Sequence, residues 1–138
     1  CSGFFEWRWM DEKGKIKIPY YVTLQNQPLF SIAGLFSNWK DKQTDQEYQT
    51  YTVLTTKANP YMEKIHNSKK RMPVILPREF EKDWLNPNLT REDVLALCQP
   101  VNQHIMNGHT ISKLITSKKE ETDVPAVLEP ASYSEVKD

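Results

Sequence analysis

The segment IHNSKKRMPVILP, residues 65–77, places a histidine and a cluster of cations directly before an apolar run. Residues 69–71 are Lys-Lys-Arg, and the run MPVIL at 72–76 has the length and composition of a buried strand. Cations that adjoin a buried strand emerge at its end, so an anion of phosphate size would lie within reach of Arg71 and His66. The alternatives are a solvated turn and a histidine that only caps a helix.

The composition is that of one globular domain. The chain has 138 residues, of which 38% are hydrophobic and 26% charged, which is enough for a single core. No apolar run reaches the ~18–20 residues of a membrane span, and no signal-peptide pattern is present. Basic and acidic side chains balance at 18 each, which argues against indiscriminate nucleic-acid binding. Residues 117–138 hold an acidic excess, so the rest of the chain is mildly basic.

The cysteines and histidines form no familiar metal pattern. Cys1 and Cys98 give no disulfide framework, which favours a reducing compartment. The spacing of Cys98, His104 and His109 matches no zinc motif, and a fourth ligand would have to be His66. We therefore expect neither a metal nor a cofactor.

Periodicity predicts that strands dominate the first half of the chain. Alternation and aromatic or β-branched residues indicate strands over six stretches: 3–9, 15–24, 29–36, 48–56, 72–76 and 109–115. The polar residues 38–47 predict an exposed loop between two of these strands.

Short helices are predicted after the fourth strand. Asn59 is followed by proline, which predicts the N-cap of a helix that ends near residue 66. Residues 78–85 repeat apolar side chains at helical spacing. Thr90 predicts the N-cap of a further helix that runs to about residue 98, with a variant of the capping box.

This order of elements indicates an α+β fold. Several strands precede the short helices without a βαβ rhythm, which favours a mixed or antiparallel sheet curled into a β-barrel-like core flanked by short helices. We expect one domain over residues 1–116 and an acidic C-terminal tail, 117–138, that is extended or loosely docked.

Glu6 lies between Phe5 and Trp7 on the first predicted strand. Because a strand alternates faces, the carboxylate points away from both rings, on the same side as Phe4 and Arg8. One interpretation is a solvated face, since glutamates are mostly exposed. The alternative is a carboxylate held beside aromatic rings and used as an acid or base.

Four blocks of sequence occur in a diagnostic order: GFFEW (3–7), AGLF (33–36) with Trp39, TVLTTKAN (52–59) and IHNSKKRMPVILP (65–77). Together they resemble the SOS response-associated peptidase (SRAP) family, also called abasic-site processing proteins, over roughly residues 1–85. The resemblance implies a single compact domain with a β-barrel-like core flanked by short helices.

The resemblance also implies an enzyme of the DNA damage or SOS response that binds single-stranded DNA at abasic sites. In the family, an N-terminal cysteine exposed by removal of the initiator Met captures the sugar aldehyde. Its α-amine forms a Schiff base and its thiol closes a thiazolidine, while the autoproteolytic step underlies the peptidase label. We expect a peptidase or lyase that acts as a monomer, without membrane contact. In a bacterium it would be cytoplasmic, and nucleoid-associated when acting on DNA.

The family's functional residues are carried over position by position. The active-site glutamate falls on Glu6 and the active-site histidine on His66. The phosphate-contacting arginine falls on Arg71, with Lys70 beside it as a further DNA contact. Thr55 matches a polar position of the family's active site.

One departure concerns the nucleophile. The family's cysteine begins a Cys-Gly sequence well upstream of the Phe-Glu-Trp block, whereas here Cys1 is followed by Ser2 and stands directly before that block. We therefore interpret this chain as the C-terminal part of an SRAP protein that lacks the nucleophile. The alternatives are a non-catalytic module that binds single-stranded nucleic acid and a peptidase that acts on other proteins in trans.

Overall fold

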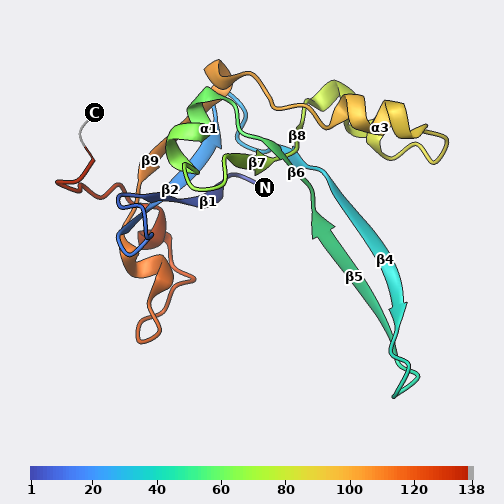
Figure 1. Ribbon diagram of the computed structural model, residues 1–138, viewed down its shortest axis with the longest axis horizontal. Coiled ribbons are helices and arrows are strands. Elements are labelled where there is room, and N and C mark those ends of the chain that lie inside the picture. Colours follow the sequence, from blue (N-terminus) through green and yellow to red (C-terminus); the bar gives the residue numbers. More distant parts are fainter. Residues whose placement is uncertain (137–138) are drawn as a thin grey trace.

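Nine short strands form four antiparallel sheets in the computed structural model, which describes residues 1–136 (Figure 1). The three-stranded sheet has the order β1-β2-β9 and contains β1 (Phe4–Trp9), β2 (Lys17–Leu24) and β9 (Met106–Thr110). The two-stranded sheets pair β3 (Ser31–Ile32) with β8 (Ile75–Leu76), β4 (Gly34–Lys40) with β5 (Glu47–Val53), and β6 (Thr55–Lys57) with β7 (Arg71–Pro73).

The helices are short. The α-helices are α1 (Pro60–Ile65), α2 (Glu81–Trp84) and α3 (Arg91–Leu97), and single 3₁₀ turns occupy residues 78–80, 103–105, 113–116 and 125–128. Within residues 1–136, no helix has the length and apolar character needed to cross a membrane.

Both predicted N-caps are confirmed. The Asn59 side-chain oxygen accepts a hydrogen bond from the Met62 amide at 2.9 Å. Thr90 and Asp93 form a reciprocal capping box at the start of α3, and these hydrogen bonds hold the pKa of Asp93 below its ordinary value. The two helices therefore begin where the sequence predicts.

The main core lies between the three-stranded sheet and α1. It consists of alternate residues of β2, the inner face of α1, and methionines of β7 and β9: Ile18, Tyr20, Val22, Leu24, Met62, Ile65, Met72 and Met106. Asn59 is buried with them, and its side-chain amide donates to the Val101 carbonyl at 2.8 Å. This bond satisfies a buried donor and ties the start of α1 to the segment before β9.

Three chain segments change partners at one buried junction, formed by Ala33, Leu54 and Val74. The Ala33 amide donates to the Val74 carbonyl at 2.8 Å, and the Val74 amide to the Leu54 carbonyl at 2.9 Å. The Leu54 amide donates to the Ala33 carbonyl at 3.0 Å, which closes the cycle. These residues stand between β3 and β4, between β5 and β6, and between β7 and β8. Each segment therefore pairs with one neighbour before the junction and with the other beyond it.

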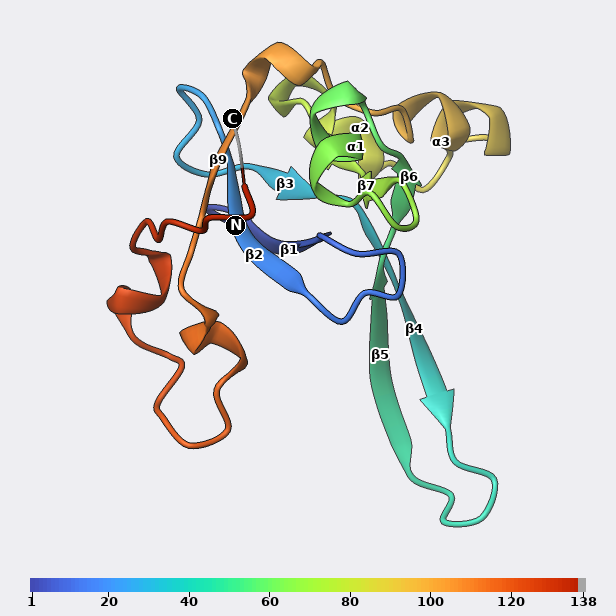
Figure 2. The ribbon, with the colours of Figure 1, turned by 60° about the vertical axis from the view of Figure 1, so that its left-hand side comes forward.

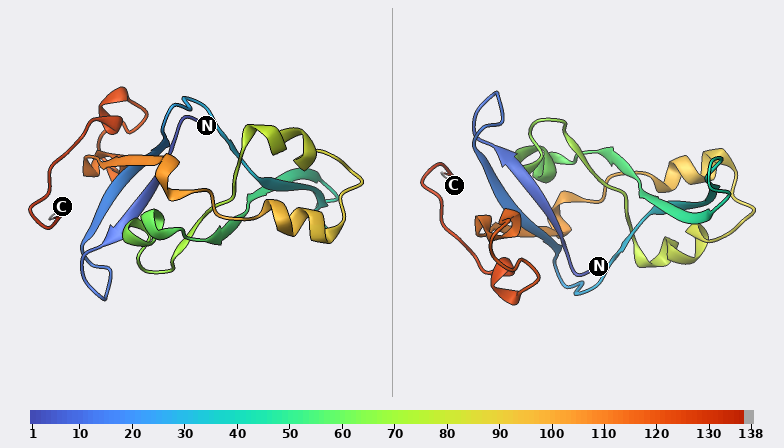
Figure 3. Two further views of the ribbon diagram at one scale, coloured as in Figure 1. Left: turned by 90° about the horizontal axis from the view of Figure 1, so that it is seen from above. Right: turned by 90° about the horizontal axis from the view of Figure 1, so that it is seen from below.

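The prediction of an α+β fold is confirmed, whereas the prediction of a barrel-like core is wrong. Within residues 1–136 no sheet closes on itself. The strands expected over 29–36, 48–56 and 72–76 are each divided in two at the junction, and the pairs diverge from there. The β4–β5 hairpin leaves the body as a separate ribbon (Figure 2). Views from above and below place the three-stranded sheet at one end of the molecule and β4, β5, α2 and α3 at the other (Figure 3).

The exposed loop expected over residues 38–47 is shorter than predicted. β4 continues to Lys40 and β5 begins at Glu47, so polar residues extend the hairpin. The Asp41 carboxylate accepts hydrogen bonds from two amides of the loop, at residues 43 and 44, which turns the chain sharply. The polar residues at the two ends of this segment thus belong to exposed strands, and only those between them form the loop.

The strand expected over residues 109–115 lies earlier, at Met106–Thr110. Ser112 then caps a 3₁₀ turn over Lys113–Thr116 by accepting a hydrogen bond from the Leu114 amide. A side-chain oxygen that competes for backbone amides in this way ends the strand.

The last part of the chain packs along the continuation of β9. The Ala131 amide donates to the Thr110 carbonyl at 2.9 Å, and the Tyr133 hydroxyl donates to the Ile111 carbonyl at 2.7 Å. Val127 is buried. Residues 127–133 therefore contact the domain, while the domain boundary at residue 116 stays a prediction.

The junction leaves no space for a larger side chain at Ala33, which is 1% exposed. We expect Ala33→Leu to lower the free energy of unfolding by about 1–3 kcal/mol, because overpacking forces the surrounding backbone apart. Ala96→Leu, on the exposed side of α3, is the matched control and should change stability by less than about 0.5 kcal/mol. Urea denaturation of the two variants measures the difference, and equal midpoints would contradict the role of the junction.

Candidate functional site

Glu6 and His66 come together at the rim of the main core. Glu6 lies on β1, the edge strand, opposite Tyr20 of β2, so its side chain is on the sheet face that covers the core. His66 is the C-cap of α1, where its amide donates to the Met62 carbonyl at 2.7 Å. The Glu6 Oε2 and His66 Nδ1 atoms are 3.5 Å apart. The two residues that the resemblance assigns to the active site thus lie side by side, and their catalytic roles stay predictions.

Hydrogen bonds fix how each side chain is presented. The Glu6 Oε1 atom accepts from the Trp7 amide at 2.9 Å, which leaves Oε2 toward the histidine. The His66 Nδ1 atom lies 2.8 Å from the Arg71 carbonyl. Because a carbonyl oxygen only accepts, Nδ1 carries a proton, and Nε2 is the nitrogen that can gain or lose one. The side chains are 20% and 18% exposed, so a solute can reach both.

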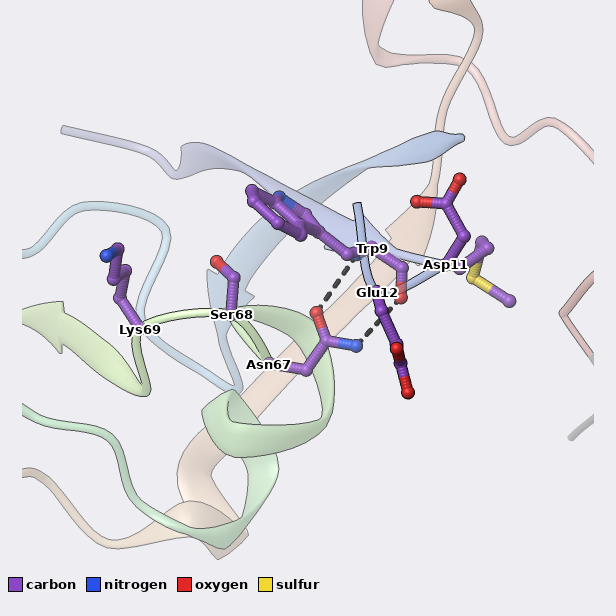
Figure 4. Close-up of a pocket in the computed structure, with 7 residues that line it drawn as sticks. Trp9, Asp11, Glu12, Asn67, Ser68 and Lys69 are labelled. Carbon is purple, nitrogen blue, oxygen red and sulfur yellow. Dashed lines mark hydrogen bonds between the residues drawn. The ribbon is translucent and has the colours of Figure 1, made fainter. Parts of the chain in front are cut away.

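Asn67 clamps the loop after His66 to the outer edge of β1. Its Oδ1 atom accepts from the Trp9 amide at 3.0 Å, and its Nδ2 atom donates to the Trp9 carbonyl at 2.8 Å (Figure 4). The amide thus pairs with the free edge of β1 as a neighbouring strand would. Glu6 is on β1, and His66 directly precedes Asn67. The two hydrogen bonds of Asn67 therefore connect the strand that carries Glu6 to the loop that follows His66.

The loop itself is closed by backbone hydrogen bonds. The Lys70 amide donates to the His66 carbonyl at 2.9 Å, and Lys70 adopts a positive φ of 51°. The Lys70 carbonyl accepts a hydrogen bond from the Ala58 amide at 2.9 Å, directly before β7 begins at Arg71. A shallow hollow lies beside this loop, lined by Trp9, Met10, Asp11, Glu12, Asn67, Ser68 and Lys69 (Figure 4).

Arg71 and Thr55 lie on one exposed face of the β6–β7 ribbon. Directly paired residues in antiparallel strands share a face, and the pairs here are Lys57 with Arg71 and Thr55 with Pro73. Met72 points the opposite way, into the core. Lys57 therefore belongs to the same surface. Lys57 was not among the residues predicted from the sequence, although alternation along residues 55–57 could have indicated it.

The cations of this surface differ in their pairing. Lys70 lies 3.7 Å from Glu63, but both side chains are about half exposed, so the pair contributes little. Within residues 1–136, no carboxylate lies within 4 Å of the Arg71 guanidinium. Arg71 is thus available to an anion from solution.

Other reactive groups lie apart from this arrangement. The Cys1 backbone nitrogen donates to the Phe30 carbonyl at 2.8 Å, and the Phe30 amide donates to the Cys1 carbonyl at 2.9 Å. Burial raises the pKa of the Cys98 thiol, which disfavours the thiolate. Among residues 1–136, no three side chains of His, Cys, Asp or Glu are grouped so as to hold a metal ion.

Comparison with known proteins identifies relatives for most of the chain. A sequence profile of the family described as SOS response associated peptidase (SRAP) matches residues 1–118. Abasic site processing protein YoqW of Bacillus subtilis is 42% identical over 120 residues, which are 86% of this chain and 51% of YoqW. Abasic site processing protein HMCES of Xenopus tropicalis is 27% identical over 141 residues, covering 88% of this chain and 40% of that protein.

A solved structure shares the fold. A crystal structure of a protein from Bacteroides thetaiotaomicron superposes with a TM-score of 0.85 at 36% identity, covering 95% of this chain and 54% of that one. The chain thus spans about half the length of the relatives that it matches. The family profile matches from residue 1 onward, which lends no support to the expectation that this is a C-terminal part of a longer protein.

Removing the Asn67 clamp should loosen the edge of β1. In Asn67→Ala we expect the Trp9 amide to exchange with deuterium about fivefold faster, because a net hydrogen bond contributes about 1 kcal/mol. Asn67→Asp keeps an acceptor for the Trp9 amide but sets a carboxylate against its carbonyl, so it should not restore the clamp. Asn88→Ala, at an exposed loop position, is the control. Equal Trp9 exchange in the alanine variants would show that the clamp contributes nothing.

Proposed function

Because this chain belongs to the SRAP family, we propose that it binds single-stranded DNA at abasic sites and takes part in processing them in the DNA damage response. Its Bacillus and Xenopus relatives bear the name abasic site processing protein. Since the chain spans about half their length, their complete activity is part of the proposal and not a premise of it.

The observation that carries the proposal is the pair of opposed cations on β6–β7. Lys57 and Arg71 face each other on an exposed surface, and like charges in that position destabilise a ribbon. A phosphate group between them would remove this repulsion, with Arg71 binding two oxygens and Lys57 acting as a point charge. The Thr55 hydroxyl would bind the same backbone, and Lys70 a neighbouring phosphate.

Glu6 and His66 would act on the damaged sugar held beside this surface. A ring-opened abasic sugar presents an aldehyde. A primary amine that adds to its carbon forms a C–N bond, and the aldehyde oxygen leaves as water to give a Schiff base. A thiol then adds to the imine carbon and closes a thiazolidine. Each step moves protons, which we assign to His66 Nε2, with Glu6 stabilising the imidazolium.

Cys1 is poorly situated to supply the amine and thiol. Its backbone nitrogen and carbonyl are both hydrogen-bonded to Phe30. Glu6 is five positions further along the chain, a span of about 17 Å when the chain is extended. We therefore assign the covalent step, and the peptidase and lyase activities linked to it, to a nucleophile other than Cys1.

A second candidate is a module that binds single-stranded DNA without chemistry. It would need the same cationic face but no acid or base. The close approach of Glu6 and His66 favours the first candidate, since a surface that only binds phosphate gains nothing from a carboxylate nearby.

Phosphate binding by the β6–β7 face and recognition of the abasic sugar by Glu6 and His66 can be tested separately, by comparing the affinities for abasic and intact single strands. Arg71→Gln and Lys57→Gln should each weaken binding to both strands equally and lower the salt dependence by about one phosphate contact. Glu6→Gln should instead reduce the preference for the abasic strand, by about tenfold if loss of the imidazolium that Glu6 stabilises removes one charge-assisted hydrogen bond from His66 to the sugar. Fluorescence anisotropy over a salt series measures both quantities.

Lys42→Gln is the matched control, because Lys42 is exposed at the far tip of the β4–β5 hairpin. It should leave affinity and salt dependence unchanged. Loss of binding to only some intact sequences in Arg71→Gln would mean that this residue reads bases. No preference for abasic over intact strands in the unchanged protein would favour the module without chemistry.

The covalent step has its own test. We expect the chain to bind an abasic single strand without forming a stoichiometric adduct that survives denaturation, because Cys1 does not reach the site. Denaturing electrophoresis and intact-mass measurement detect such an adduct. A stoichiometric adduct that disappears in Cys1→Ser would make Cys1 the nucleophile and overturn this assignment.

A further inference from the structure

The Glu6 and His66 side chains are each fixed only within their own part of the chain. The Glu6 Oε1 atom accepts a hydrogen bond from the Trp7 amide at 2.9 Å, which is a bond inside β1. The His66 amide donates to the Met62 carbonyl at 2.7 Å, and Nδ1 donates to the Arg71 carbonyl at 2.8 Å. Both bonds of the histidine lie within the segment from α1 to β7. These bonds orient the two side chains but do not set the distance between β1 and the end of α1.

The attraction between the two side chains is too weak to set that distance. Glu6 Oε2 and His66 Nδ1 are 3.5 Å apart, whereas a charge-assisted hydrogen bond is about 2.7–2.9 Å long. The Nδ1 proton is directed to the Arg71 carbonyl and is not shared with the carboxylate. Both side chains are partly exposed, and ion pairs that water reaches contribute little. A separate contact must therefore fix their spacing.

Asn67 supplies that contact. Its side-chain amide bonds to the Trp9 amide at 3.0 Å and to the Trp9 carbonyl at 2.8 Å (Figure 4). Within residues 1–136, these are the only hydrogen bonds that join β1 to residues 60–71. A side-chain amide offers an acceptor and a donor side by side, which matches the N–H and C=O of one residue on a strand edge. Because Asn67 directly follows His66, the two bonds act one residue away from the imidazole.

The Glu6 carboxylate and the Asn67 amide are anchored on the same edge of β1. The N–H and C=O of Trp9 point away from β2, since both bond to Asn67. Backbone groups alternate between the two edges of a strand, so the Trp7 amide, two residues earlier, points to the same edge. That amide holds the Glu6 carboxylate, and the two anchoring points are about 7 Å apart along the strand. One stretch of backbone thus places both Glu6 and the residue after His66.

We infer that Asn67 is a positioning residue for the Glu6–His66 pair. It keeps the imidazole beside the carboxylate that stabilises its charged form. It is not a catalytic residue in this assignment, because its amide bonds to Trp9 and acts through His66. The inference rests on the proposed function for what the pair acts on, while the geometry of the pair is independent of DNA.

A double-variant cycle tests this role. The measured quantity is the preference for abasic over intact single strands, obtained from dissociation constants by fluorescence anisotropy. Asn67→Ala should lower the preference by up to about tenfold, the contribution that Glu6→Gln removes, and leave the affinity for the intact strand unchanged. Combining Asn67→Ala with Glu6→Gln should cost no more than Glu6→Gln alone, because both changes disable the same pair.

Ser68→Ala is the matched control, because it removes a polar group from the same loop, and it should keep the preference. Three results would overturn the inference. They are an unchanged preference in Asn67→Ala, an equal loss of affinity for abasic and intact strands, and losses that multiply in the double variant. The last result would mean that Asn67 acts independently of Glu6.

A second readout needs no DNA and separates failure of this inference from failure of the proposed function. At one fixed pH, Glu6→Gln should move the NMR resonance of the His66 Cε1 proton. The movement should be smaller in the Asn67→Ala background, where the carboxylate and the imidazole are further apart. If the unchanged protein shows no preference for abasic strands, the proposed function fails and this measurement still decides the role of Asn67. An equal movement in both backgrounds would show that Asn67 does not position the pair.

Discussion

The cycle of hydrogen bonds among Ala33, Leu54 and Val74 is the constraint from which the architecture follows. In an ordinary pair of strands, the backbone hydrogen bonds of one segment run to a single neighbouring segment. Here three segments meet, and the amide of each donates to the carbonyl of the next. Buried amides and carbonyls cannot be left unpaired, so the cycle fixes where each segment changes partner. The β6–β7 ribbon on one side of the junction carries the cationic face. The β4–β5 hairpin on the other side leaves the body.

The candidate site depends on this constraint indirectly. β7 begins at Arg71 and leads to Val74 of the junction three residues later, and the Arg71 carbonyl accepts the proton of His66 Nδ1. One residue thus offers its side chain to solvent on the ribbon while its backbone sets the tautomer of the histidine. Asn67 adds the second connection, because it joins the loop to the edge of β1. The acid–base pair and the cationic face are in this way parts of one backbone arrangement.

The hairpin explains why the molecule is not a barrel. Its strands have apolar residues on both faces, as strands of a closed or sandwiched sheet do, but within residues 1–136 no further strand lies beside them. A closed sheet removes open edges, whereas here both edges stay open. The barrel was predicted because several strands precede the short helices, and those strands are present. Closure depends on which strands are neighbours, and alternation along one strand carries no information about that.

The sequence by itself determined the local elements and the identities at the site. Asn59 and Thr90 mark helix starts because side-chain caps act within three residues, and the position of Glu6, His66 and Arg71 in the family blocks indicated the candidate chemistry. Only the tertiary structure decided that Glu6 faces the core, since β1 turned out to be an edge strand whose covered face meets the end of α1. It also added Lys57 and Asn67, whose partners are 14 and 58 residues away in the chain. Contacts at such separations depend on strand neighbours and loop closure, which no local pattern encodes.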